Sequence, residues 1–196
     1  MMKIAAIATA AFVAAASGQI YSSSFESGED GFVGTNDWER GIPVGFNGAP
    51  FGGPEPVGGH TGDFAWGTVI GGAHNPSTIS SLSQTFDFTG YTGVSLSYYE
   101  WLDSGGNSFD TAETIVNGDV LLLADGGPTN GWREVTLDLS AYDGMNSVTI
   151  DFLFSTTGVV ERVGWYIDDV AIRGVPAPAS AALLGLGGLV ATRRRR

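Results

Sequence analysis

The chain has 196 residues, with 30 glycines, 8 prolines and no cysteine, and 43% of its residues are hydrophobic but only 15% charged. This composition argues against helical bundles and coiled coils, and it excludes disulfide frameworks, iron–sulfur clusters and cysteine-bound zinc. The formal charge is −12, and the body of the chain contains no cluster of Lys and Arg. Because binding to a nucleic-acid backbone needs such a cluster, we expect no nucleic-acid partner.

The first 18 residues have the pattern of a secretory signal peptide. A single cation, Lys3, precedes an apolar stretch at residues 4–16, and the small residues Ser17 and Gly18 follow. A basic start, an apolar stretch of about 7–15 residues and small residues at the cleavage point are typical of such signals. Cleavage after Ala16 or after Gly18 fits this pattern. We therefore expect residues 1–18 to form a signal helix and the protein to be exported.

The body of the chain, residues 19–174, has the pattern of an all-β domain. Turn dipeptides such as Asn117-Gly118 separate short segments in which apolar and polar residues alternate. The clearest alternation runs over residues 94–99, 133–139 and 147–155. Such alternation indicates strands with one buried face, so we predict one antiparallel β-sandwich of the jelly-roll type. The Gly- and Pro-rich residues 41–62 are predicted to form a long irregular loop.

The segment 175–196 combines three features in order. A proline motif, Val175, Pro176, Ala177 and Pro178, is followed by an apolar run at residues 179–191 and by the cluster Arg193, Arg194, Arg195 and Arg196. A run of 13 residues is about 20 Å long as a helix, which is short for a hydrocarbon core of about 30 Å. We expect a short C-terminal apolar helix that anchors marginally, with its arginines on the cytoplasmic side.

This order resembles the PEP-CTERM sorting signal of bacteria that secrete exopolysaccharide, although Ala177 stands where that family usually has Glu. The resemblance implies export across the inner membrane and transient membrane anchoring. It further implies processing by an exosortase-type sorting enzyme and release to the cell surface or extracellular matrix. A plain weak membrane anchor is the alternative, and Ala177 leaves cleavage of the tail open.

Three motifs of the body, at residues 25–28, 60–68 and 164–170, stand in a characteristic order. They read Phe-Glu-Ser-Gly, His-Thr-Gly-Asp-Phe-Ala-Trp-Gly-Thr and Gly-Trp-Tyr-Ile-Asp-Asp-Val. Together they resemble the MAM-like jelly-roll domain found beside immune-inhibitor-A-type metallopeptidases and, alone, in the choice-of-anchor J family. That family has no established common activity, so the resemblance implies a fold more than a function. It also implies that His60 holds a loop by hydrogen bonds and that Trp66 and Trp165 lie in the core.

The same resemblance implies a structural calcium ion. In jelly rolls of this kind the first and last strands are neighbours, so Glu26 and one of Asp168 and Asp169 face one ion through carboxylate oxygens. Successive side chains of a strand point to opposite faces, so only one of these aspartates lines such a site unless a bulge intervenes. The alternative is that the carboxylates cap a turn or accept hydrogen bonds from backbone N–H groups.

Exposed aromatic rings are the usual platform for sugars, because a ring face stacks on the C–H surface of a pyranose. Trp38 and Trp101 are our candidates for a ligand-binding face, since both adjoin acidic or Gly-rich segments. Four further aromatic residues are available for such a face: Tyr98, Tyr99, Trp132 and Tyr142. A group of acids between residues 100 and 113 (Glu100, Asp103, Asp110 and Glu113) is interpreted as solvated loop charge, with binding of a cation or a sugar hydroxyl as the alternative.

Neither the His-Glu-x-x-His pattern of metallopeptidases nor the Gly-x-Ser-x-Gly pattern of serine hydrolases occurs in the sequence, so we expect no enzyme. The sequence therefore predicts an exported, non-catalytic cell-surface or matrix protein that associates with extracellular polysaccharide. Divalent ions would bridge its acidic body to an acidic polysaccharide. The alternatives are an adhesive module that binds a surface protein and, less favoured, a hydrolase of matrix polysaccharide.

Overall fold

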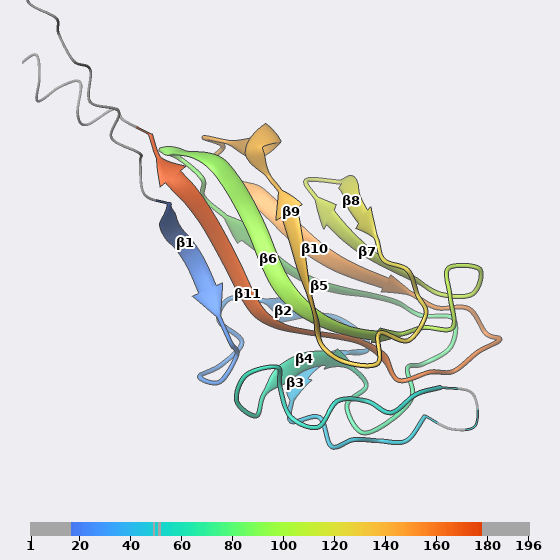
Figure 1. Cartoon of the computed structure of the whole chain (residues 1–196). Coiled ribbons are helices and arrows are strands. Elements are labelled where there is room, and N and C mark those ends of the chain that lie inside the picture. Colours follow the sequence, from blue (N-terminus) through green and yellow to red (C-terminus); the bar gives the residue numbers. More distant parts are fainter. Residues whose placement is uncertain (1–16, 49, 51, 178–196) are drawn as a thin grey trace, which may run out of the picture.

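Strands with alternating apolar residues build two antiparallel sheets that face each other (Figure 1). The computed structural model describes residues 17–48, 50 and 52–177. The predicted signal helix at residues 1–16 and the predicted tail from Pro178 onward, with its apolar helix and arginine cluster, lie outside these residues. The all-β antiparallel sandwich predicted from the sequence is confirmed.

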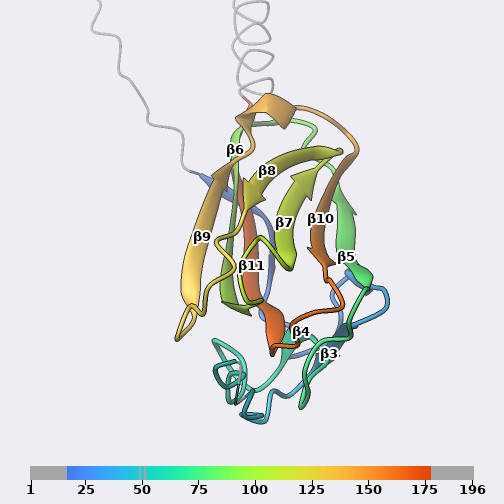
Figure 2. The same ribbon diagram turned by 90° about the vertical axis from the view of Figure 1, so that its right-hand side faces the viewer.

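Sheet A has the strand order β3-β4-β11-β6-β9, and β1 pairs with β11 beside β4. Its strands are β1 (Gly18–Ser23), β3 (Trp38–Gly41), β4 (Ala65–Thr68), β6 (Tyr91–Asp103), β9 (Arg133–Asp138) and β11 (Gly164–Pro176). Sheet B has the order β2-β5-β10-β7-β8. Its strands are β2 (Val33–Gly34), β5 (Ile79–Phe86), β7 (Thr111–Val116), β8 (Asp119–Leu123) and β10 (Val148–Ser155). Figure 2 shows the two layers nearly edge-on.

The core lies between the sheets and is built from the inward residues of each strand. Tyr98 of β6, Phe152 of β10 and Trp165 of β11 are all fully buried, and the Phe152 ring contacts both of the other two rings edge-on. Burying each such side chain stabilises the fold by roughly 1.5–3 kcal/mol. The predicted alternating segments correspond to β6, β9 and β10. The predicted core positions of Trp66 and Trp165 are also confirmed.

The turn at Asn117-Gly118 joins β7 to β8. Val116 and Asp119 are paired across it, and the backbone φ angles of Asn117 and Gly118 are 50° and 90°. Two consecutive positive φ angles are the requirement of the type I′ hairpin turn, which Asn-Gly satisfies with little strain. Elsewhere in the described chain the only helical turn is η1 (Ser140–Tyr142), which follows β9.

A bulge in β11 places two neighbouring acids on one side of sheet A. Asp169 has a φ of 48°, and the pairing of β11 with β6 shifts register between Asp168 and Ala171. The extra residue lets both Asp168 and Asp169 face the loop at residues 60–64, while Ile167 and Val170 on either side remain in the core. The sequence argument allowed both aspartates to face one side only if a bulge intervened, and the structure contains that bulge.

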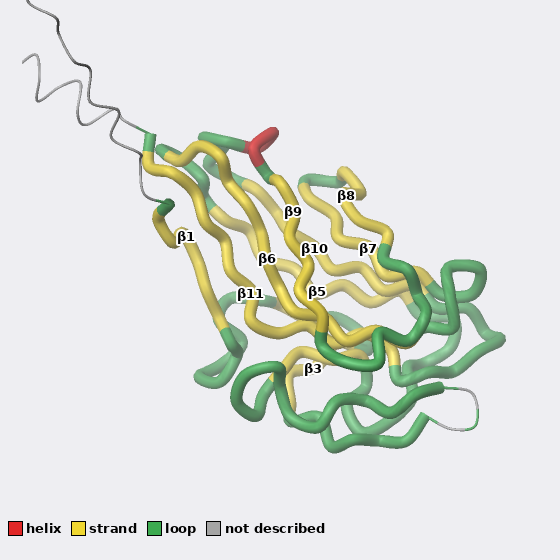
Figure 3. Tube along the Cα trace, in the orientation of Figure 1, coloured by secondary structure: helices red, strands yellow, loops and turns green. Residues whose placement is uncertain are grey.

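The long loop between β3 and β4 covers one end of sheet A. It contains two isolated bridges, Val44 to Val57 and Asn47 to Pro54, and is otherwise irregular as predicted. Buried Glu55 holds it in place by accepting hydrogen bonds from the backbone N–H groups of Val44, Phe46 and Gly71. Figure 3 shows this loop layer at the end of the sandwich opposite the first residues of β1 and the last residues of β11.

The first and last strands of the chain extend past the predicted domain boundaries of 19 and 174. Strand β1 begins at Gly18, and β11 includes Val175 and Pro176. The N–H of Ala177 also donates to the carbonyl of Gly90 over 2.6 Å. The first half of the predicted sorting motif is therefore part of the last strand. Among residues 17–177, no helix has the length and apolar character needed to cross a membrane.

Candidate functional site

Tyr99, Trp101 and Trp132 form a group of aromatic side chains on the outer side of sheet A, which we call the aromatic face. Tyr98 and Leu102 of β6 point into the core, so the alternation of the strand turns Tyr99 and Trp101 outward. Trp132 lies directly before β9, the neighbour of β6. The rings of Trp101 and Trp132 are 6.2 Å apart at 74°, and all three side chains are partly exposed. Two of these rings thus form a corner open to solvent.

The imidazole of His60 extends the aromatic face. It stacks on Tyr99 with ring centroids 3.5 Å apart and planes within 9°, and its edge meets Trp132 at 6.2 Å. The His60 Nδ1 atom lies 2.6 Å from a carboxylate oxygen of Asp169. This contact and the stack hold the imidazole in one plane, so His60 fixes the orientation of Tyr99 from the side of the loop.

A small hollow of about 140 Å³ lies beside Trp101, and we call it the Trp101 hollow. Its lining residues are Gly53, Pro54, Trp101, Asp103, Pro128 and Asn130. The Nε1–H of Trp101 donates to the carbonyl of Pro54 over 3.2 Å, which fixes the ring against the loop layer. The volume corresponds to about five water molecules. The hollow therefore has room for one part of a glycan, such as a single sugar ring.

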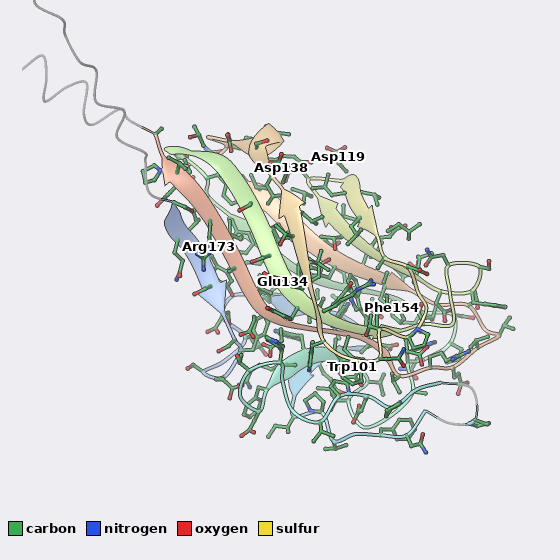
Figure 4. The ribbon with its side chains drawn as sticks, viewed as in Figure 1. Trp101, Asp119, Glu134, Asp138, Phe154 and Arg173 are labelled. Carbon is green, nitrogen blue, oxygen red and sulfur yellow. The ribbon has the colours of Figure 1, made fainter. Side chains whose placement is uncertain are left out.

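Two polar side chains of the Trp101 hollow are held in place by hydrogen bonds. The carboxylate of Asp103, which is 1% exposed, accepts from the N–H of Gly53 over 2.6 Å and lies 3.5 Å from a guanidinium nitrogen of Arg162. The amide of Asn130 donates to the carbonyl of Pro128 over 3.1 Å. Figure 4 shows Trp101 near the loop layer, with Glu134 and then Asp138 farther along β9. An acceptor and an amide thus border the ring that is best placed for stacking.

The three predicted calcium ligands converge on the loop at residues 60–64. One oxygen of Glu26 accepts from the N–H groups of Asp63 and Phe64, at 3.0 and 2.8 Å. One oxygen of Asp168 accepts from the N–H groups of His60 and Thr61, at 2.7 and 3.1 Å. The prediction that His60 belongs to a hydrogen-bonded loop is confirmed.

These carboxylates act as hydrogen-bond acceptors in the structure. The oxygens of Asp169 contact the His60 ring and the Thr61 hydroxyl, and burial raises the pKa of Asp168 to about 7. Within residues 17–48, 50 and 52–177, no three His, Asp or Glu side chains are grouped so that they could hold a metal ion. Backbone N–H donors point at one oxygen of Glu26 and one of Asp168, as in the alternative in which these carboxylates accept hydrogen bonds. The calcium ion stays a prediction of the resemblance.

Of the two tryptophans predicted for a ligand-binding face, only Trp101 lies on one. Trp38 is 4% exposed, and its ring packs against Trp165 with centroids 5.7 Å apart. The assignment of Trp38 to a ligand face is therefore corrected, because its strand turns the indole into the core. The sequence contains Tyr99 and Trp132 but offers no reason to prefer them until β6 and β9 are known to be neighbours.

The acids between residues 100 and 113 are also corrected, since three of the four are buried rather than solvated. Glu100 lies with Tyr98 and Leu102 on the inner side of β6, where it accepts from the Nε1–H of Trp165 over 2.8 Å. Asp110 accepts from the N–H of Thr157 over 2.7 Å. Asp103 lines the Trp101 hollow, and only Glu113 is partly exposed.

A larger and more open hollow of about 630 Å³ lies between β1 and the bulge of β11. Its polar lining includes the carboxylates of Glu26, Asp30 and Asp169. Glu26 and Asp169 accept hydrogen bonds from the loop at residues 60–64, and Asp30 accepts one from the hydroxyl of Ser23. Glycoside hydrolysis needs one carboxyl group free to donate a proton and another free to attack or activate water. The hydrolase alternative gains no support from this hollow.

Comparisons with known proteins identify the fold. No protein-family model matches the chain. Bacillopeptidase F of Bacillus subtilis (strain 168) is 26% identical over 167 residues, which is 78% of this chain and 10% of that protein, so the chain spans about a tenth of its relative.

Two solved structures have similar folds. The carbohydrate-binding module TmCBM61, solved in complex with β-1,4-galactotriose, matches with a TM-score of 0.52 and 12% identity, over 76% of this chain and 92% of that one. The K2 cleaved adhesin domain of Lys-gingipain matches with a TM-score of 0.50 and 16% identity, over 80% and 99%. At such identities the likeness establishes the two-sheet β-sandwich and no more.

Proposed function

We propose that this chain is an exported, non-catalytic protein that binds polysaccharide through its aromatic face, at the cell surface or in the extracellular matrix. The observation that carries the proposal is the partly exposed corner of Trp101 and Trp132, with the Trp101 hollow beside it. A corner of two indole rings offers stacking surfaces in two directions to a sugar that enters it.

The aromatic face is organised before any ligand arrives. The Trp101 indole is tied to Pro54, and the Tyr99 ring is stacked on His60. Groups that are already ordered lose little conformational entropy on binding, so more of the contact energy contributes to affinity. Asp103 and Asn130 supply an acceptor and an amide for sugar hydroxyls at the same place. A stacking ring bordered by a few polar groups is the usual composition of a sugar site.

The comparisons support this proposal at the level of fold. TmCBM61 is a carbohydrate-binding module that was solved with a galactose trisaccharide bound, and the Lys-gingipain domain is an adhesin domain. A β-sandwich of this type is thus a scaffold on which both kinds of binding occur. For this chain, the partly exposed tryptophan corner favours the carbohydrate.

Export and sorting belong to the proposal and rest on the two ends of the sequence. The apolar stretch after Lys3 supports a cleaved signal peptide. The segment 175–196 supports an exosortase-type enzyme as a processing partner and transient anchoring in the inner membrane. Since β1 starts at Gly18, cleavage after Ala16 leaves that strand whole, and we favour it over cleavage after Gly18.

The test is binding of the purified full chain to two probes. The first is the exopolysaccharide of the producing cells, measured by co-sedimentation, and the second is soluble β-1,4-galactan, measured by titration. We expect Trp101→Ala to weaken binding about tenfold or more, which corresponds to losing about 1.4 kcal/mol of stacking and burial. Ile79→Ala is the matched control, because Ile79 is 65% exposed on β5 of the other sheet. Equal binding by the wild type and Trp101→Ala would contradict the aromatic face as the site.

A second candidate function is adhesion to a protein. The loop at residues 42–57 exposes four large apolar side chains: Ile42 (45%), Val44 (67%), Phe46 (36%) and Val57 (82%). Apolar side chains gathered on one exposed loop are a frequent mark of protein–protein contact. If the wild-type chain binds neither polysaccharide, this loop becomes the leading candidate. Val44→Asp is then the variant to compare in binding assays with surface proteins of the producing cells.

A further inference from the structure

We propose that the aromatic face selects glycans without carboxylate or sulfate groups and rejects acidic glycans. This inference rests on the proposed function and adds a ligand class to it. It departs from the expectation that the acidic chain is bridged to an acidic polysaccharide by divalent ions. Its basis is the position of the charged side chains around Tyr99, Trp101 and Trp132.

Three carboxylates lie close to the aromatic face. Glu134 is exposed and is the cross-strand partner of Tyr99, which places their Cβ atoms about 4.5–5.5 Å apart on the same side of sheet A. Asp103 forms a wall of the Trp101 hollow. Asp169 contacts the His60 ring that stacks on Tyr99. A glycan that stacks on these rings therefore comes close to the exposed carboxylate of Glu134 and to that of Asp103, whose charge Arg162 offsets in part.

The positive charges of the described chain are committed elsewhere. Residues 17–177 contain 21 acidic residues, four arginines and no lysine, a formal charge of −17. Arg133 follows Trp132 and its side chain is 43% exposed, but its Nε–H donates to the buried carboxylate of Glu100 over 2.7 Å, so its charge is paired within the protein. Arg162 sits behind Asp103, and Arg40 binds the carbonyls of Phe25 and Glu26.

The remaining cations do not offset the carboxylates at the face. Arg173 is exposed on β11, but it pairs with Ser95, toward the end of the sheet where β1 begins and β11 ends (Figure 4). His60 lies 2.6 Å from the Asp169 carboxylate, so any positive charge on its ring is offset by that carboxylate. None of the residues that line the Trp101 hollow is basic.

An acidic sugar unit at this face experiences repulsion that a neutral unit does not. Exposed charges interact over roughly one Debye length, about 8 Å at physiological ionic strength, and the spacing of Glu134 from Tyr99 is within that range. Stacking of the sugar C–H surface is the same for both units, so the difference in affinity comes from the charge. That difference must shrink when salt shortens the Debye length.

The experiment compares one polysaccharide with its own charged derivative. The full chain is titrated, in the presence of EDTA, with β-1,4-galactan and with the same galactan after part of its C6 hydroxyls have been oxidised to carboxylates. At about 20 mM NaCl we expect the oxidised galactan to bind at least about tenfold more weakly, and at about 500 mM NaCl the gap should fall to about threefold or less.

Charge variants locate the effect. Glu134→Lys should reduce, at low salt, the ratio between the affinities for galactan and for oxidised galactan. Glu113→Lys changes the net charge equally but lies on β7 of sheet B, so it should narrow the gap less. Equal narrowing by both variants would overturn the assignment to the face.

The outcomes separate this proposal from the proposed function. A chain that binds the exopolysaccharide of its cells, yet binds oxidised galactan as tightly as galactan, keeps the function and overturns the selectivity. Absence of binding to the exopolysaccharide and to both galactans overturns the function, and the selectivity with it.

Discussion

Trp38 and Trp101 carry the same side chain, yet strand direction gives them different roles. Trp38 of β3 packs on Trp165 in the core, whereas Trp101 of β6 is turned outward and tied to Pro54. Local composition around the two residues does not distinguish them. What distinguishes them is which residues of each strand point inward. In the four-residue strand β3 the sequence is too short to show this, and only the pairing of the strand in the sheet does.

We predict that replacing the two tryptophans separates stability from binding. Trp38→Ala leaves a cavity in the core and should lower the free energy of unfolding by about 3–5 kcal/mol. Trp101→Ala should lower it by clearly less, because the ring is only partly buried, while it removes most of the glycan binding. Urea unfolding of both variants measures the difference. Similar losses of stability in both would show that the Trp101 ring is a structural element.

The raised pKa of Asp168 leads to a second prediction. Burial raises its pKa from 3.8 to about 7, despite the backbone N–H groups that it accepts from. Between these values the folded chain keeps a proton that the unfolded chain has released. The stability from this group is therefore complete below about pH 4 and is lost as pH rises through about 7.

The variant Asp168→Asn isolates this contribution. The stability advantage of the wild type over Asp168→Asn should be larger at about pH 4.5 than at about pH 7.5, because only the wild type loses the bound proton. Urea unfolding at both pH values measures the advantage. An advantage that is constant or grows with pH would contradict the raised pKa.

Among the elements, the loop layer between β3 and β4 depends on one buried carboxylate. Glu55 accepts three backbone N–H groups and also the hydroxyl of Tyr166 on β11, at 2.6 Å. Burial, reinforced by Glu55, raises the pKa of Tyr166, so the phenol stays a donor. This contact attaches the loop that carries Pro54 to the centre of sheet A.

We predict that Tyr166→Phe loosens this loop. Losing a hydrogen bond to a charged group should cost about 1.5–3 kcal/mol. Amide hydrogen exchange at Val44, Phe46 and Gly71 should become faster, while the amides of β10 keep their protection. Unchanged exchange at these three amides would contradict the role given to Glu55.

Much of this architecture follows from the sequence, and the exceptions have physical reasons. Alternation in β6, β9 and β10 and the Asn117-Gly118 turn predict the sandwich. The bulge at Asp169 cannot be read from the sequence, because it is a single extra residue whose positive φ is imposed by the pairing with β6. The partnership of Trp101 with Trp132 depends on the pairing of β6 with β9, which is a long-range contact.

At the scale of the whole molecule, the dominant feature is the charge of −17 carried by 21 acids and four arginines between residues 17 and 177. Mutual repulsion of this size destabilises a compact state, and salt screens it. We therefore predict that raising NaCl from about 50 to about 500 mM increases the melting temperature of the full chain. A melting temperature that is flat or falls over this range would contradict a net repulsive surface.

The same measurement tests calcium. CaCl₂ is compared with NaCl at equal ionic strength, and EDTA serves as the reference. A rise specific to calcium would establish the ion as a ligand of the folded state. Equal effects of the two salts would leave Glu26, Asp168 and Asp169 as the hydrogen-bond acceptors that they are in the structure.

The most direct test of the aromatic face uses the five tryptophans as internal probes. Trp38, Trp66 and Trp165 are at most 4% exposed, whereas Trp101 and Trp132 are partly exposed. In a titration of the ¹⁵N-labelled chain with β-1,4-galactan or the exopolysaccharide of its cells, the indole N–H signals of Trp101 and Trp132 should shift. The other three should stay in place. Binding that leaves the Trp101 and Trp132 signals unmoved would contradict the aromatic face as the carbohydrate site.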